Sequence, residues 1–90
     1  MRVWVKLMKN THMIKETTIV RDEEDTRTHK VLHALEEACH TLDLSTPIWL
    51  EKNIKQFQRA AKTRFTQDNF IETIEFDYLE LQILEEDLYL

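Results

Sequence analysis

Residues 28–40, THKVLHALEEACH, bring together side chains that bind metal ions or transfer protons. His29 and His33 are four residues apart, so on a helix they share one face and could hold two positions around a divalent cation. One helix presents its ligands along a line, however, and a tetrahedral site needs a further ligand from elsewhere in the fold. We therefore expect no metal site, and a metal-dependent enzyme that uses His29 and His33 is the weakest of three hypotheses.

Helical phase predicts where these side chains point. At about 100° per residue, one polar stripe collects His29, His33, Glu36 and His40. The opposite side of the same helix is apolar and collects Leu32, Leu35, Ala38, Cys39 and Leu42. We expect the histidines on the outside and Cys39 in the core as an unreactive thiol. The segment also lacks the His-Glu-x-x-His order of zinc hydrolases.

A second candidate for function is the basic stretch EKNIKQFQRAAKTR, residues 51–64. Its lysines and arginines recur at helical spacing and share a face opposite Leu50, Ile54 and Phe57. The candidate binding residues are Lys52, Lys55, Arg59, Lys62 and Arg64. They favour contact with a nucleic-acid backbone, or they form the solvated face of an amphipathic helix. Because the net charge is −5, a nucleic-acid-associated accessory protein is the second hypothesis.

The composition excludes several classes of site. The chain has no glycine, so it holds neither a Walker loop nor a dinucleotide-binding fingerprint, and no cofactor is expected. Left-handed turns must use other residues, of which Asn10, Asn53 and Asn69 are the best suited. The single cysteine fits a reducing compartment. No signal peptide and no run of about 20 apolar residues is present, so we expect a cytoplasmic protein.

Acidic side chains gather at the end of the chain, where residues 70–90 hold seven carboxylates and no basic side chain. Glu75 and Asp77 would share one face of a strand, and Glu80 would lie on the other. General acid–base catalysis needs such groups to converge in a sheltered pocket. In a small domain we expect a solvated sheet edge instead of a catalytic pair, since charges on an edge strand deter aggregation.

Periodicity places these residues on a small set of elements. Alternation predicts two strands, residues 2–8 and 13–20, joined as a hairpin. Thr26 and Asp25 are suitable N-caps for a helix over 26–42, and Thr46 with Pro47 predicts a second helix to Ala61. Residues 62–70 read as an irregular connection. Residues 69–76 fit a strand or a short helical turn, with a break near 77–78 before a strand over 79–85.

The predicted fold is one α+β domain spanning residues 1–90, in the order ββααβ, with two helices on one face of a small antiparallel sheet. The other face would then expose apolar side chains, for which the candidates are Trp4, Met8, Met13 and Ile19. Exposed apolar patches often mark an interface. We therefore expect a homodimer, or else cover by the C-terminal residues. Residues 86–90 are expected to form a mobile tail.

The anchors PIWLEKNIKQF…KTRFTQDNFIE…FDYLEL, residues 47–81, resemble small uncharacterised proteins of Firmicutes-type bacteria, a family without an assigned activity. The resemblance rests on aromatic and apolar positions. It implies a bacterial cytoplasmic protein and assigns no catalytic residue. The leading hypothesis is a non-enzymatic protein–protein interaction module that binds itself or another protein.

Overall fold

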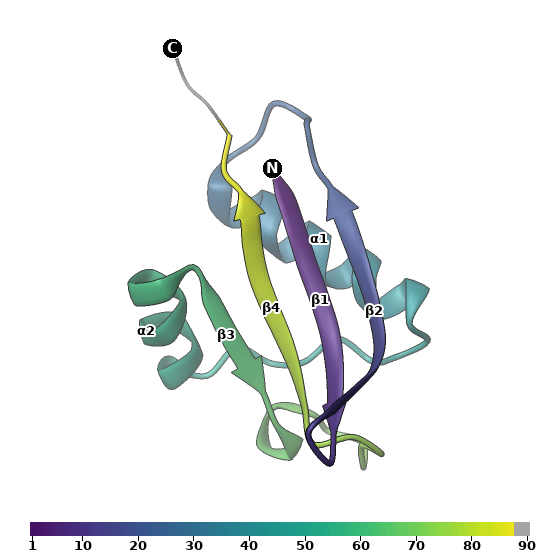
Figure 1. Ribbon diagram of the computed structural model, residues 1–90. Coiled ribbons are helices and arrows are strands. Elements are labelled where there is room, and N and C mark those ends of the chain that lie inside the picture. The colour runs from purple at the N-terminus through teal and green to yellow at the C-terminus, as the bar shows by residue number, and fades with distance from the viewer. Residues whose placement is uncertain (88–90) are drawn as a thin grey trace.

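The computed structural model describes residues 1–87 as one four-stranded antiparallel sheet with two helices (Figure 1). The strands are β1 (Arg2–Lys9), β2 (His12–Val20), β3 (Lys62–Phe65) and β4 (Tyr78–Glu85), and their order across the sheet is β2-β1-β4-β3. The helices are α1 (Arg27–Thr41) and α2 (Glu51–Ala60), and a 3₁₀ turn, η1, spans Gln67–Asn69. The α+β class, the hairpin and the first helix are confirmed.

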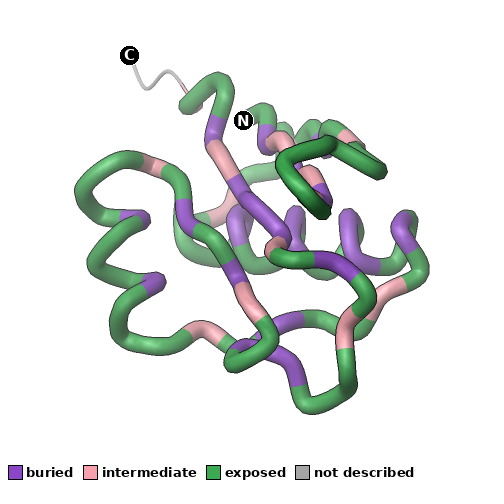
Figure 2. The backbone as a smooth tube through the Cα atoms, turned by 60° about the horizontal axis from the view of Figure 1, so that its bottom comes forward, coloured by how far each residue is buried: buried purple, intermediate pink, exposed green. Residues whose placement is uncertain are grey.

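Both helices cover the same face of the sheet. Strand residues that point toward them are fully buried, including Val3, Val5 and Leu81. α1 packs beneath β1 and β2 through Ala34 and Leu35, which have no exposed surface. α2 packs against β3 at the far edge of the sheet (Figures 1 and 2). The period-two pattern of β1 thus predicted the buried face correctly. In the part of the chain that the structure describes, no helix covers the opposite face.

Within residues 1–87, four residues other than glycine have a positive φ angle. The hairpin turn uses Asn10 (φ 51°) and Thr11 (φ 65°), the combination required of a two-residue turn of type I′. Asp43 (φ 59°) follows α1, and Ala61 (φ 54°) ends α2. The expectation for Asn10 is confirmed. Two of the four residues, Thr11 and Ala61, adopt this conformation at a steric cost, since the chain has no glycine that could take these positions.

The connection expected over residues 62–70 contains a strand instead. β3 pairs with β4, with Thr63 opposite Leu81 and Phe65 opposite Leu79. Thr63 and Phe65 are buried, whereas Lys62 and Arg64 are exposed. This alternation is the signature of a strand, but it lasts only four residues and follows a helical pattern directly. β3 is therefore an additional strand, which the sequence did not predict, at one edge of the sheet.

The second helix begins at Glu51, four residues after Pro47, because tertiary contacts hold the intervening segment extended. The amide N–H of Ile48 donates to the carbonyl of Asn69 at 2.7 Å, and the Asn69 side chain donates back to the Ile48 carbonyl at 2.7 Å. Asn53 is fully buried, whereas Ile54 is 48% exposed. The prediction that Ile54 faces the sheet was therefore wrong, and Asn53 occupies the buried side of α2 instead.

Asn53 and Asn69 form a buried polar network that joins α2, β3 and η1. The Asn53 side chain donates to Thr63 Oγ1 at 2.9 Å and to the Arg64 carbonyl at 2.8 Å. Its Oδ1 accepts from the Leu50 amide at 3.1 Å and from Asn69 Nδ2 at 2.7 Å. Neither asparagine adopts the left-handed conformation expected of it. Both instead satisfy buried backbone groups that the irregular segments leave unpaired.

β4 begins at Tyr78, so the predicted break in phase lies where it was expected. Glu86 and Asp87, placed in the predicted tail, make ion pairs: Arg27 contacts Glu86 at 2.8 Å and Lys30 Nζ contacts Asp87 at 2.6 Å. The rest of the predicted tail, 88–90, lies outside the described residues. Among residues 1–87, no helix has the length and apolar character needed to cross a membrane.

Candidate functional site

The histidines of α1 lie on its solvent-facing side, as helical phase predicts. His29, His33 and His40 are exposed, and so is Glu36. His29 Nδ1 lies 2.9 Å from a carboxylate oxygen of Asp25, and the rings of His29 and His33 stack with centroids 6.2 Å apart. Within residues 1–87, no three His, Cys, Asp or Glu side chains are grouped so that they could hold a metal ion.

Cys39 lies in the core with no exposed surface. Burial raises the pKa of its thiol to about 11, because the surrounding apolar side chains cannot stabilise a thiolate. A nucleophilic cysteine needs the opposite shift. The structure therefore places this side chain where it packs and does not react.

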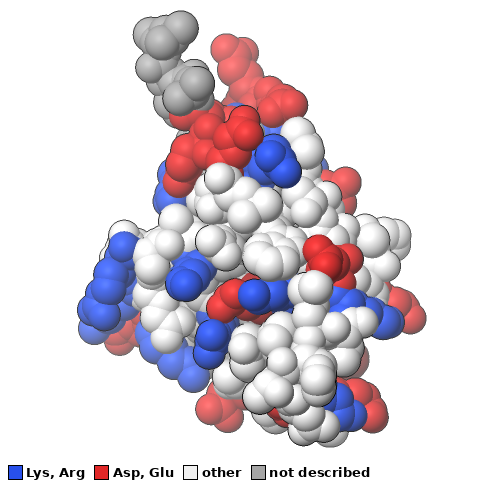
Figure 3. Space-filling view, viewed as in Figure 1, with Lys and Arg blue, Asp and Glu red and all other residues white. Residues whose placement is uncertain are grey.

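The five basic candidates are exposed and fall on two adjacent elements. Lys52, Lys55 and Arg59 belong to α2, and Lys62 and Arg64 belong to β3. Arg59, Lys62 and Arg64 line a shallow hollow of about 350 Å³. Figure 3 shows basic side chains gathered on this side of the molecule. The structure therefore brings three of the five basic candidates to one hollow, two of them from a strand, whereas Lys55 pairs with Glu51 at 3.2 Å.

The face of the sheet that the helices leave uncovered, here the outer sheet face, carries a row of interacting side chains across three strands. Glu80 is buried between two cations: Lys6 Nζ lies 3.1 Å away and Arg64 Nε lies 3.0 Å away. Arg64 also stacks on Tyr78 at 4.4 Å from the ring centroid. Lys6 lies 4.5 Å from the ring centroid of Trp4. These contacts order the centre of the face.

Cross-strand pairing fixes which other residues share the outer sheet face, because directly opposed residues point to the same side. Trp4 pairs with Thr18, and Met8 pairs with both Met13 and Tyr78. Trp4, Met8 and Met13 thus lie on one surface, as predicted. Ile19 does not: it pairs with Val3, is 6% exposed and belongs to the core.

Burial of Glu80 raises its pKa, but hydrogen bonds from Arg64 and Lys6 outweigh that effect, so the pKa lies below its ordinary value. A carboxylate held ionised between two cations is suited to structure and not to proton transfer. Glu75 and Asp77 do not share a strand face as expected, because both precede β4, which is an inner strand of the sheet and not an edge strand. Asp77 accepts a hydrogen bond from the Asn10 amide at 2.8 Å, and Glu75 is exposed.

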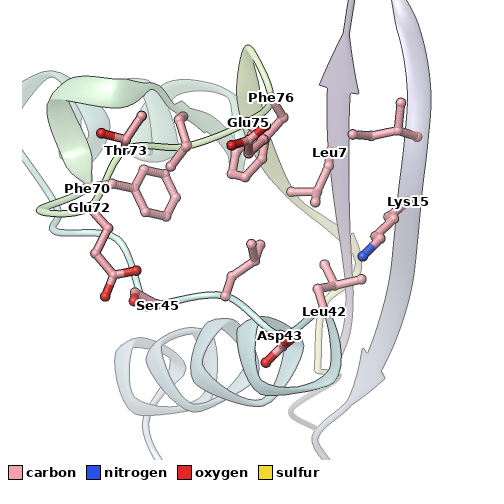
Figure 4. Close-up of a pocket in the computed structure, with 13 residues that line it drawn as sticks. Leu7, Lys15, Leu42, Asp43, Ser45, Phe70, Glu72, Thr73, Glu75 and Phe76 are labelled. Atoms are coloured by element: carbon pink, nitrogen blue, oxygen red, sulfur yellow. The ribbon is translucent and has the colours of Figure 1, made fainter.

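A cavity of about 430 Å³ opens beside β2, between the end of α1 and residues 70–76 (Figure 4). We call it the edge pocket. Its base consists of buried apolar side chains, Leu7, Leu42, Phe70 and Phe76. Its rim carries four exposed charged side chains, Lys15, Asp43, Glu72 and Glu75. No local sequence pattern indicates this site, because its walls come from four separate segments.

A second cavity of about 390 Å³ lies between α1 and α2, lined mainly by apolar groups. Trp49 forms part of its wall and packs edge-on against Phe57 and Phe65, at centroid distances of 5.6 and 5.0 Å. Leu32 and Ile54, which helical phase placed in the core, instead line this groove. A groove therefore remains between α1 and α2.

Searches of protein families, of curated proteins and of solved structures found no match to this chain. The predicted resemblance over residues 47–81 accordingly stays a prediction. The arguments for function rest on the surfaces described above.

Proposed function

We propose that this protein is a non-enzymatic interaction module that associates with itself through the outer sheet face. The observation that carries the proposal is that a four-stranded sheet is covered by helices on one face only. Small domains gain much of their stability from association when one side of a sheet lacks cover. We further expect the module to work in a reducing, cytoplasmic compartment, as its single cysteine suggests.

Beside its charged side chains, the outer sheet face carries residue types that are common in protein interfaces. Trp4, Met8 and Tyr78 are half-buried, and Met13 and Val20 are 45% and 56% exposed. Aromatic residues, methionine and arginine are enriched at such interfaces. In the centre of the face, Lys6 and Arg64 both contact Glu80, so a second copy can pack there without burying a charge that lacks a partner of opposite sign.

The contacts of the residues best suited to chemistry also support a role without catalysis. Cys39 is buried with a raised pKa, and Glu80 is held by two cations. His29, His33 and His40 face solvent on the outside of α1. A catalytic group instead needs a pKa matched to its task and a place where substrate can reach it.

Molar mass measured by light scattering over a wide range of protein concentration tests this proposal. We expect a dimer for the wild type and a monomer for Met13→Lys, which places a charge beside Met8 on the outer sheet face. Ile71→Lys is the matched control, because Ile71 is 91% exposed and lies in the loop before β4. A wild-type protein that stays monomeric at every concentration would contradict self-association through this face.

A second candidate function is nucleic-acid binding, favoured by the hollow that Arg59, Lys62 and Arg64 line. Phosphate contacts by such side chains weaken steeply as salt increases. Fluorescence anisotropy with single-stranded RNA and duplex DNA, at low and at high salt, tests it. The double variant Arg59→Ser with Lys62→Ser should abolish binding. The control is Lys9→Ser with Lys15→Ser, which changes the net charge by the same amount at positions away from the hollow. No binding at low salt would remove this candidate.

A further inference from the structure

We propose that β2 accepts an extended segment of a partner protein at its unpaired edge, and that the segment alternates apolar residues with lysine or arginine. One apolar side chain of the segment enters the edge pocket, and its basic neighbours meet the carboxylates of the rim. This inference rests on the proposed role as an interaction module, but it concerns a different surface from the outer sheet face.

The two edges of the sheet differ in how they are protected. β3 is four residues long and has α2 packed against it. β2 is nine residues long and lies at the opposite end of the strand order. All of its residues except Thr17 and Ile19 are exposed. A long edge strand without proline presents a row of backbone N–H and C=O groups to which another strand can bind.

A bulge directs β2 toward the edge pocket. Leu7 pairs with Lys15 and Met8 pairs with Met13, so Ile14 has no partner on β1. Ile14 and Lys15 nevertheless both line the edge pocket, together with Leu7. Bulges commonly redirect a side chain beside a functional site. A strand added to β2 would therefore run past the mouth of this cavity, and alternate side chains would point toward it.

The charges around the edge pocket indicate the chemistry of the occupant. None of the ion pairs within residues 1–87 involves Asp43, Glu72 or Glu75. Lys15 is the single basic side chain that lines the cavity. The rim thus carries a net negative charge above an apolar base. Such a surface attracts a segment with basic and apolar residues, and it repels nucleic acids and acidic peptides.

Binding of a short fluorescein-labelled peptide, in which valine and phenylalanine alternate with lysine, tests the inference by fluorescence polarisation. A peptide with glutamate in place of lysine and a peptide of scrambled order are the controls for charge and for alternation. Glu72→Lys with Glu75→Lys reverses two exposed charges on the rim. Glu24→Lys with Glu36→Lys makes the same change in net charge on residues that do not line the edge pocket.

We expect the basic alternating peptide to bind about tenfold more weakly to the rim variant, while the matched control variant keeps the wild-type affinity. Amide NMR signals of β2 and of residues 42–45 should shift on binding. Equal affinity for both variants, absence of binding, or shifts confined to the outer sheet face would each overturn the inference. The light-scattering experiment on Met13→Lys is independent of these outcomes, so the two proposals can fail separately.

Discussion

Replacement of Asn53 by alanine should cost about a third or more of the stability of this domain. The side chain has no exposed surface and makes four hydrogen bonds to Leu50, Thr63, Arg64 and Asn69. Each bond contributes about 1 kcal/mol, and a buried backbone group left unsatisfied costs about 1–3 kcal/mol. The Arg64 carbonyl would lose this partner, whereas Thr63 keeps its bond to Gln56 at 2.6 Å.

We therefore expect Asn53→Ala to lower the free energy of unfolding by about 4 kcal/mol, out of about 5–15 kcal/mol for a domain of this kind. Urea denaturation followed by circular dichroism and by tryptophan fluorescence, to which Trp4 and Trp49 both contribute, gives this value. Trp49 is a suitable probe because it packs against Phe57 and Phe65 beside the network. The matched control is Lys52→Ala, an exposed neighbour on the same helix, which should change stability by less than about 0.5 kcal/mol.

A double-mutant cycle with Asn69→Ala isolates the coupling between the two asparagines. Asn69 Nδ2 donates to Asn53 Oδ1 at 2.7 Å, so the losses should be less than additive. Fully additive losses, or a loss below about 1 kcal/mol for Asn53→Ala, would show that the network does not hold α2 and β3 together.

Three further predictions concern other parts of the fold. Thr11→Gly should raise the free energy of unfolding by about 1 kcal/mol in urea titrations, because glycine adopts the positive φ of this turn without strain. The Cys39 thiol, with a pKa of about 11, should react with a disulfide reagent at neutral pH only at the rate of unfolding; rapid reaction in native buffer would disprove its burial. The lowered pKa of Glu80 adds stability that is present above its ordinary pKa of 4.5 and is lost as pH falls through the lower native value. Glu80→Gln should therefore destabilise the protein at neutral pH and flatten its acid dependence, measured as melting temperature against pH.

Local pattern was sufficient for the elements with long, regular periodicity. The alternation of Val3, Val5 and Leu7 identified the buried face of β1, and helical phase placed His29 and His33 outside. Such patterns succeed because side-chain direction within one element follows from backbone geometry alone. The absence of glycine likewise excluded phosphate-binding loops without any knowledge of the fold.

Predictions from sequence periodicity were wrong where the environment of a residue depends on segments that are distant in the sequence. Ile54 and Leu32 fit the core by phase, but they line a groove because α1 and α2 lie apart. Asn53 is polar and was expected in a turn, yet β3 and η1 bring Thr63 and Asn69 to it and make its burial favourable. Pro47 suggested a helix start, but hydrogen bonds between Ile48 and Asn69 keep that segment extended.

The amino-acid sequence by itself determined the α+β class, the hairpin, the buried cysteine and the cluster of basic side chains, since each depends on neighbours within one or two elements. Only the tertiary structure decided that Glu80 lies between Lys6 and Arg64, and that the edge pocket opens beside β2. These features require segments that are far apart in the sequence to lie side by side, and periodicity within one element does not predict which segments do so.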